Sequence, residues 1–511
     1  MIAFELCHNN VMRKLVFALL LASAFVFSLA QVEPTDVYYE IFVRSFQDSD
    51  GDGTGDLQGV IQRLDYIEAL GVTGIWFMPL HPSPTYHGYD VTDYTAINPD
   101  YGTLSDFEEL VAEAEARDID IILDLVVNHS SIQHPWFLSA AEGDEPFRDF
   151  YLWRDENPGW RGTSGDSAWH PSGDDYYLGL FWSEMPDLNY ANATVAKEME
   201  SIAEFWLNLG VDGFRVDAIQ HIFESEDGNI RSQPETFEWL AGFEAFIKTV
   251  NPDAFIVGET WTDTGTIVKY HEDGDLDMSF NYPLWSAILD AVSSRSASDL
   301  AFMLEQDERL YPEDALRGTF VSNHDQIRPA TTFGLLRRDE ARIKLAGGLL
   351  LSLPGVPFIY YGEEIGMPNG EGERDEQKRT PMLWNSGEHF GFSEAEPWHP
   401  FSSEDEAITV AAQEADPDSV LNTYKDFVAL RKSNPALHSG RTEVLDTDER
   451  SLLALIREAE GQRVLVLANV SNQDVDVDLS SFGAEGATDL LMGEAADALV
   501  PSLSVQVLGL P

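Results

Sequence analysis

"VYYEIFVRSFQDSDGDGTGDLQGVIQRLDYIEALGVTGIWFMP", residues 37–79, predicts a strand, an acidic loop, a helix and a second strand in succession. Val, Ile, Tyr and Phe are concentrated at 37–43, which is typical of a strand. Apolar residues then recur at helical spacing from Leu57 to Ile67, and Gly71 precedes a second apolar run at 74–79. A buried strand that is joined to the next strand by a helix is the repeating unit of a parallel sheet.

The same alternation of apolar runs and helical patterns continues along the chain. It predicts further strands at 119–127, 213–218, 255–260, 276–282, 320–325 and 358–364. Together with the first two strands these runs predict a closed (β/α)₈ TIM barrel. A doubly wound open sheet is the alternative.

Two parts of the chain do not follow this alternation. Residues 130–190 carry several tryptophans among Gly, Pro and Asp with little periodicity, and a loop of this length usually has a function. We expect an inserted subdomain that walls a binding cleft. From about residue 436 short apolar runs are broken by polar turns, which predicts a C-terminal antiparallel β-sandwich domain at 436–511. The barrel is then formed by 31–129 and 191–435.

The N-terminus is typical of a secretory signal peptide. Basic residues follow Met12, which is an alternative start, and an apolar run from Leu15 to Leu29 leads to the expected cleavage after Ala30. An uncleaved anchor is the alternative, although the run is short against the ~20 residues of a membrane span. We therefore expect a secreted protein, extracellular or periplasmic. Its only cysteine, Cys7, would be removed, so no disulfide is expected.

The chain is strongly acidic. Lys and Arg total 31 and Asp and Glu total 89, which gives a formal net charge of −58. This balance excludes nucleic-acid binding as the main function and disfavours anionic membranes, so a neutral or cationic substrate is expected. Acidity spread along the whole chain suggests a halophilic protein, with an ordinary acidic secreted protein as the alternative. We expect a monomer that leaves the membrane after signal cleavage.

Ionisable residues follow several predicted strands, at the barrel end where reactive groups gather. These residues are His129 after the third strand, Asp217 at the fourth, Glu259 at the fifth, and His324 and Asp325 at the seventh. A single strand-end acid is often only a helix cap. Arg215 lies two residues before Asp217, on the same strand face, and can keep Asp217 ionised. Paired carboxylates in an aromatic cleft suit glycoside hydrolysis, by either a retaining or an inverting mechanism.

Several motifs resemble those of one family. "DLVVNHS" (124–130), "GFRVDAIQH" (213–221), "VGETW" (257–261) and "VSNHD" (321–325) resemble, in order, the four conserved motifs of the α-amylase family, glycoside hydrolase family 13. "MPDLNY" (185–190), "HGYDVTDY" (87–94) and "YYGEEIGM" (360–367) are similar to its further signatures.

The resemblance implies a retaining hydrolase of α-glucosidic bonds. Asp217 would be the nucleophile, Glu259 the general acid/base and Asp325 the residue that stabilises the transition state. The resemblance further implies substrate-binding roles for Tyr89, Asp90, His129, Arg215, His324 and Arg379. Asp90 and Arg379 resemble a pair that grips the terminal glucose in α-glucosidases.

We therefore expect an α-amylase that cleaves internal α-1,4 bonds of starch-like polysaccharides. The alternative is an α-glucosidase or 4-α-glucanotransferase that acts on maltooligosaccharides. A catalytically inactive partner of a membrane transporter is disfavoured, because all three acids are present.

The acidic loop within the opening stretch has the carboxylate spacing of a calcium loop. An EF-hand would need a Glu at the position of Gly59 and a helix before the loop, so this is a different kind of turn. Relatives resembling oligo-1,6-glucosidase carry a similar loop that binds Ca²⁺ or Mg²⁺. The resemblance implies a structural Ca²⁺, with Mg²⁺ as an alternative, held by Asp48, Asp50, Asp52, the Thr54 carbonyl and Asp56. A solvated acidic turn without metal is the other interpretation.

Overall fold

The computed structural model of the chain describes residues 36–312, 315–334 and 339–511. The predicted signal peptide and Cys7 therefore lie outside the described residues. None of the helices in these ranges is long and apolar enough to cross a membrane.

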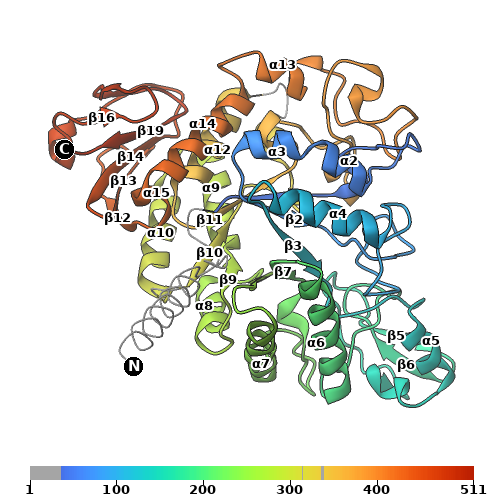
Figure 1. The fold of residues 1–511 in the computed structure, drawn as a ribbon. Coiled ribbons are helices and arrows are strands. Elements are labelled where there is room, and N and C mark those ends of the chain that lie inside the picture. Colours follow the sequence, from blue (N-terminus) through green and yellow to red (C-terminus); the bar gives the residue numbers. More distant parts are fainter. Residues whose placement is uncertain (1–35, 313–314, 335–338) are drawn as a thin grey trace, which may run out of the picture.

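Eight parallel strands close into a barrel, as predicted (Figure 1). They are β1 (Tyr38–Ile41), β2 (Gly74–Phe77), β3 (Asp120–Leu125), β7 (Gly213–Val216), β8 (Phe255–Gly258), β9 (Met278–Phe280), β10 (Leu316–Thr319) and β11 (Val356–Tyr360). The last strand pairs with the first, so the barrel has no open edge. Large side chains such as Tyr38, Trp76 and Phe358 fill its interior.

Helices surround the barrel and bury their apolar faces against it. They are α2 (Leu57–Gln62), α3 (Leu64–Leu70), α4 (Leu104–Glu115), α6 (Ala193–Asn208), α7 (Pro234–Val250), α8 (Thr264–Glu272), α9 (Tyr282–Ser294), α10 (Ser298–Leu310), α11 (Pro329–Phe333), α12 (Glu340–Ser352), α13 (Val410–Glu414) and α14 (Val420–Ser433). The helical spacing from Leu57 to Ile67 corresponds to two short helices, because the chain leaves helical geometry at Arg63. Asp56 caps the first of them through the N–H of Gly59 (2.7 Å).

The seventh strand was predicted at the wrong place. Strand β10 ends at Thr319, and the predicted residues 320–325 form the turn that follows it. The true strand was missed because it contains Gly318 in place of a large apolar residue. A Cβ at Gly318 would lie 2.9 Å from Cδ1 of Phe280, so the barrel interior leaves no space for a side chain there. In the turn, Asn323 accepts a hydrogen bond from the N–H of Asp325 (2.9 Å), which favours a bend over an extended strand.

The residues predicted as an inserted subdomain form a small unit of their own beside the barrel (Figure 1). It contains α5 (Pro135–Glu142) and a three-stranded antiparallel sheet of β4 (Trp153–Arg154), β5 (Trp169–Ser172) and β6 (Asp175–Leu178). A bridge between His129 and Asp187 joins the end of the subdomain to the segment after β3, and a bridge between Tyr151 and Leu188 lies within the subdomain. The subdomain is thereby fixed over the carboxyl end of β3.

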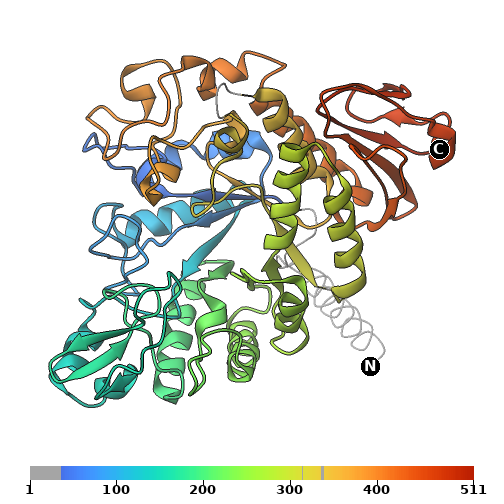
Figure 2. The same ribbon diagram turned by 180° about the vertical axis from the view of Figure 1, so that it is seen from behind.

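The C-terminal domain is antiparallel, as predicted, and lies against α12 and α10 (Figure 2). One sheet contains β12 (Arg441–Leu445), β13 (Leu452–Ala459), β14 (Gln462–Asn469), β19 (Ser504–Gly509), β16 (Thr488–Asp489) and β17 (Glu494–Ala495), and a small second sheet pairs β15 (Val475–Asp476) with β18 (Leu499–Val500). The short helix α15 (Pro435–His438) precedes the first strand. Arg457 is buried at the junction and donates to the Ser352 carbonyl (3.2 Å), which ties the domain to α12.

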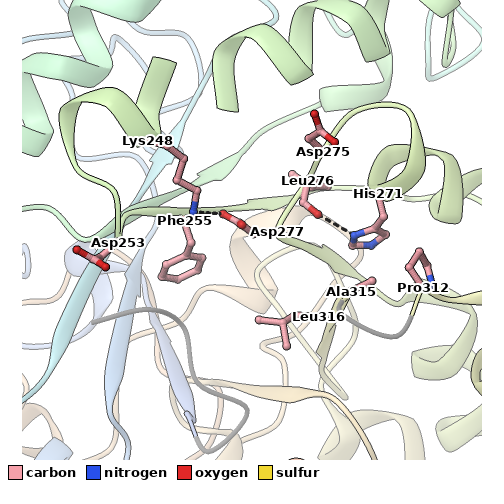
Figure 3. A pocket seen from close by; sticks show the side chains of 10 residues that line it. All are labelled: Lys248, Asp253, Phe255, His271, Asp275, Leu276, Asp277, Pro312, Ala315 and Leu316. Carbon is pink, nitrogen blue, oxygen red and sulfur yellow. Dashed lines mark hydrogen bonds and ion pairs between the residues drawn. The ribbon is translucent and has the colours of Figure 1, made fainter. Parts of the chain in front are cut away.

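A polar pocket lies at the amino-terminal end of β8, β9 and β10 (Figure 3). Its central groups bond to one another: Lys248 pairs with Asp277 (2.9 Å), and His271 lies 2.8 Å from the Leu276 carbonyl. These central groups are already bonded to one another. They also lie at the amino-terminal end of the strands, whereas the functional site of such a barrel is expected at the carboxyl ends.

Candidate active site

Arg215 is the centre of the candidate site. Its guanidinium is almost fully buried and contacts three carboxylates. Nη1 lies 2.9 Å from Oδ1 of Asp124 and 2.5 Å from Oδ1 of Asp217, and Nη2 lies 3.0 Å from Oε2 of Glu259. Strands β3, β7 and β8 are neighbours in the barrel, so their carboxyl ends bring these side chains together. The predicted pairing of Arg215 with Asp217 is present.

The backbone after β7 also positions Glu259. Ala218 has a positive φ of 50°, and its N–H donates to Oε2 of Glu259 (2.9 Å). Burial raises the pKa of Glu259, although Arg215 opposes the shift. Burial raises the pKa of Asp217 to about 6, against the lowering by Arg215. At neutral pH Asp217 is therefore ionised, while Glu259 holds its proton more readily than an ordinary Glu.

Asp325 has a contrasting environment. Burial alone would raise the pKa of Asp325, but His324, followed by Arg379, holds it well below its usual range. His324 lies 3.2 Å from Oδ2 of Asp325 through Nε2 and 2.6 Å from Glu40 through Nδ1. Burial opposes its charge, but Asp325 and Glu40 together raise the pKa of His324 to about 9. Arg379 contacts the other oxygen of Asp325 (2.9 Å). Asp325 is thus an anion held between two cations.

Tyr89 and His129 form the adjoining wall. The Tyr89 hydroxyl donates to Oδ2 of Asp124 (2.9 Å), and its ring stacks on His324 at 5.6 Å between centroids. His129 Nε2 lies 3.0 Å from the Tyr89 carbonyl. Burial lowers the pKa of His129 to about 3, so its imidazole is neutral. The structure therefore brings these predicted residues to one place.

Asp90 and Arg379 do not form an ion pair with each other in the described part of the chain. Oδ1 of Asp90 accepts hydrogen bonds from the hydroxyls of Ser83 and Thr85. Its Oδ2 is buried and has no hydrogen-bond partner among the described residues. Such an unsatisfied oxygen is costly unless a ligand or water occupies it.

Sequence reasoning missed several residues of this site. Asp124 lies within a quoted motif, and its alternation with buried strand residues was a usable signal. Glu40 was visible as a carboxylate inside the apolar run of 37–43. Tyr86 and Trp398, described below, carried no signal.

A pocket beside Glu259 and Asp325 is lined by both the barrel and the inserted subdomain. Phe181 and Thr163 come from the subdomain, and Glu259, Trp261 and Asp325 come from barrel loops. Trp261 is 46% exposed and stacks on Tyr282 at 5.0 Å with an interplanar angle of 5°. An exposed aromatic face beside buried acids suits a neutral ring-shaped ligand, and the inserted subdomain walls this pocket.

The acidic loop brings three of its predicted ligands together. Oxygens of Asp48, Asp50 and Asp56 lie within 4.8 Å of one another. Asp52 lies outside this group and accepts from the N–H of Thr54 (2.7 Å). Backbone N–H groups orient the Asp48 carboxylate, including that of Gly53 (2.8 Å). The loop thus offers hard oxygen donors that fit Ca²⁺ or Mg²⁺.

Comparisons with known proteins agree with this geometry. Residues 40–440 match the family model of the α-amylase catalytic domain, and residues 442–506 match that of the maltogenic amylase C-terminal domain. The chain is 40% identical over 469 residues to "Alpha-amylase 3" of Dictyoglomus thermophilum, with 90% of each chain covered. It is 36% identical over 513 residues to the trehalose-6-phosphate hydrolase of Escherichia coli, covering 86% of this chain and 90% of that protein.

Among solved structures, the crystal structure of the α-amylase from H. orenii superposes with a TM-score of 0.82 at 36% identity, covering 94% of this chain and 100% of that one. The family models together span nearly all of the described residues. The chain belongs to the α-amylase family, glycoside hydrolase family 13, and is a glycoside hydrolase whose substrate class is the α-glucans.

Proposed function

We propose that this enzyme is a secreted retaining α-amylase that cleaves internal α-1,4-glucosidic bonds of starch-like polysaccharides. The observation that carries the proposal is the bridging of Asp217 and Glu259 by the two terminal nitrogens of one guanidinium. Carboxylates held side by side in this way suit direct attack on the sugar. An inverting enzyme needs a wider separation, about 6.5–9.5 Å, to admit a water molecule.

The proposed reaction has two displacements. Asp217 attacks the anomeric carbon while the bond to the leaving oxygen breaks, and the Glu259 carboxyl donates its proton to that oxygen. A covalent glycosyl-enzyme results. Glu259, now a carboxylate, takes a proton from water, whose oxygen attacks the same carbon and releases Asp217. Two inversions leave the configuration unchanged.

The pKa pattern supports this assignment of roles. Burial raises the pKa of Glu259, which favours a proton donor, whereas His324 and Arg379 keep Asp325 ionised. A permanent anion beside the reacting sugar stabilises the positive charge that develops in an oxocarbenium-like transition state. Asp325 is therefore proposed to act electrostatically and through the sugar hydroxyls.

A second activity has its own supporting observation. The buried oxygen of Asp90 that has no partner among the described residues is suited to accept a hydrogen bond from a sugar hydroxyl. An enzyme that grips the terminal glucose in this way would be an α-glucosidase or a 4-α-glucanotransferase.

The products formed from soluble starch distinguish these activities. We expect maltooligosaccharides of several lengths in the first minutes, with a rapid fall in viscosity, because internal bonds are cut. Early release of glucose alone would contradict internal cleavage and favour the α-glucosidase. Products longer than the substrate, made from maltotriose, would indicate the transferase. Asp217→Asn is the inactive control.

We also propose that Asp48, Asp50 and Asp56 hold a structural Ca²⁺, with Mg²⁺ as the alternative occupant. The proposal is supported by the closeness of their carboxylate oxygens, which lie within 4.8 Å of one another, and by the preference of Ca²⁺ and Mg²⁺ for oxygen ligands. The cation would take no part in bond cleavage. It would offset repulsion among carboxylates that the chain places in one turn.

A further inference from the structure

Trp398 connects the acidic loop to the segment that follows the barrel. Its backbone N–H donates to the Gly53 carbonyl (2.9 Å). Two further bonds join the same pair of segments: the N–H of Asp48 donates to the Phe392 carbonyl (3.0 Å), and the Ser393 hydroxyl donates to the Asp48 carboxylate. The two segments are therefore fastened along several residues.

The indole of Trp398 also contacts the active site through Tyr86. The two rings stack at 5.5 Å between centroids with an interplanar angle of 23°. The Tyr86 hydroxyl lies 3.4 Å from Nη1 of Arg379, and the Arg379 guanidinium carbon lies 5.7 Å from the centre of its ring. Arg379 in turn holds Asp325 at 2.9 Å.

A second connection reaches the backbone of Arg379. Nε1 of Trp398 donates to the Ser45 hydroxyl (2.9 Å), and that hydroxyl donates to the Arg379 carbonyl (2.5 Å). Ser45 ends the short 3-10 helix Val43–Ser45 that follows β1, so it lies close to the barrel. Trp398 thus contacts groups that fix both the side chain and the main chain of one arginine.

We propose that Trp398 is a positioning residue for the known reaction. It sets the position of Arg379, and through Arg379 that of Asp325, and the acidic loop in turn fixes Trp398. The inference rests on the proposed role of Asp325 and Arg379 in holding the attacked glucose. Its physical basis is that a small displacement of a group that contacts the transition state reduces the rate strongly.

The test compares Trp398→Leu with Trp398→Phe in hydrolysis of maltoheptaose, a substrate of α-amylases and α-glucosidases alike. Both kcat/KM and Tm are measured, with kinetics well below the melting transition. Trp398→Leu is expected to lower kcat/KM about tenfold, because it removes both the stacked ring and the Nε1 donor. Trp398→Phe keeps a ring on Tyr86 and is expected to recover part of this loss.

Trp239→Leu is the matched control, because Trp239 is also half-buried and stacks on another ring, that of Phe243, at 5.1 Å. It is expected to change Tm without changing kcat/KM. If Trp398→Leu likewise lowers only Tm, Trp398 is merely structural and the inference is overturned.

The part played by the loop is tested with Ser393→Ala, which removes the hydroxyl bonded to Asp48 without changing a carboxylate. A fall in kcat/KM is expected, and it should not add to that of Trp398→Leu in the double variant, because both changes would act on the rate through the position of the Trp398 side chain. Full additivity, or no effect of Ser393→Ala, would overturn the role of the loop. Each variant is compared with the wild type on maltoheptaose, so the comparison does not depend on internal cleavage of starch. A wild type that fails to cut starch internally would contradict the proposed function but not the role of Trp398.

Discussion

Arg215 holds two carboxylates that have opposite tasks in the proposed reaction. Asp217→Asn removes the nucleophile, and Glu259→Gln removes the proton donor, so each is expected to lower kcat on maltoheptaose at least about 1,000-fold. Each amide keeps the size of the side chain, so the circular dichroism spectrum should not change. Asp299→Asn, an exposed acid at the start of α10, is the control. A well-folded Asp217 or Glu259 variant with nearly normal kcat would contradict the assignment.

The pH dependence follows from the same two residues. Because burial raises the pKa of Asp217 to about 6, kcat/KM is expected to fall as the pH drops below about 6, where a protonated Asp217 cannot attack. At higher pH, kcat/KM falls because Glu259 loses its proton. The raised pKa of Glu259 moves this fall to higher pH. Asp124→Asn removes a charge that raises the pKa of Asp217, so it should shift the acid limb to lower pH. An acid limb near the ordinary Asp value of about 3.9 would contradict this picture.

The gathering of most residues of the candidate site was predictable, because parallel strands place their carboxyl ends at one end of a barrel. Asp217, Glu259 and Asp325 follow from that rule, and Arg215 follows from its spacing along one strand. Trp398 does not, since its contacts with Tyr86 and Ser45 join segments more than 300 residues apart in the chain. No local pattern encodes a contact between two such loops.

Among the elements, the acidic loop is proposed to hold a structural cation. Removing the cation leaves Asp48, Asp50 and Asp56 repelling one another, so a chelator is expected to lower Tm by about 2–6 °C, and added Ca²⁺ should restore it. Asp50→Ala should abolish the effect of the chelator. Asp52→Ala is the matched control and should keep that effect, because Asp52 lies outside the cluster. A melting curve that is identical in excess chelator would leave the solvated-turn interpretation.

The order of the barrel strands was predicted correctly, but the position of one strand was not. Seven of the eight barrel strands overlap their predicted stretches, since buried parallel strands are continuous apolar runs. The seventh, β10, differs because its sequence, Leu316 to Thr319, includes Arg317 and Gly318. Arg317 pairs with Glu308 of α10 (3.3 Å), and the glycine accommodates Phe280. Both features depend on neighbours distant in sequence, which a local pattern does not show.

At the scale of the whole molecule, acidity is a property of the surface. Helix α4, for example, presents Glu108, Glu109 and Glu115 to solvent while it buries Phe107 and Leu110. Helix α4 is thus an ordinary amphipathic element, but its exposed face carries mainly negative charge. With a formal net charge of −58, like charges repel one another across the molecule.

Added salt should relieve this repulsion, because the Debye length falls from about 10 Å at 0.1 M to about 3 Å at 1 M. We therefore expect Tm to rise by several degrees between 0.1 and 1 M NaCl. The α-glucan substrate is neutral, so charge does not steer its encounter with the enzyme, and KM for a maltooligosaccharide should stay within about a factor of two. Both quantities are measured on one preparation. A Tm that stays constant or falls would contradict adaptation to salt. A large change in KM alone would instead indicate an ion bound in the cleft, where the cationic Arg379 and His324 flank Asp325.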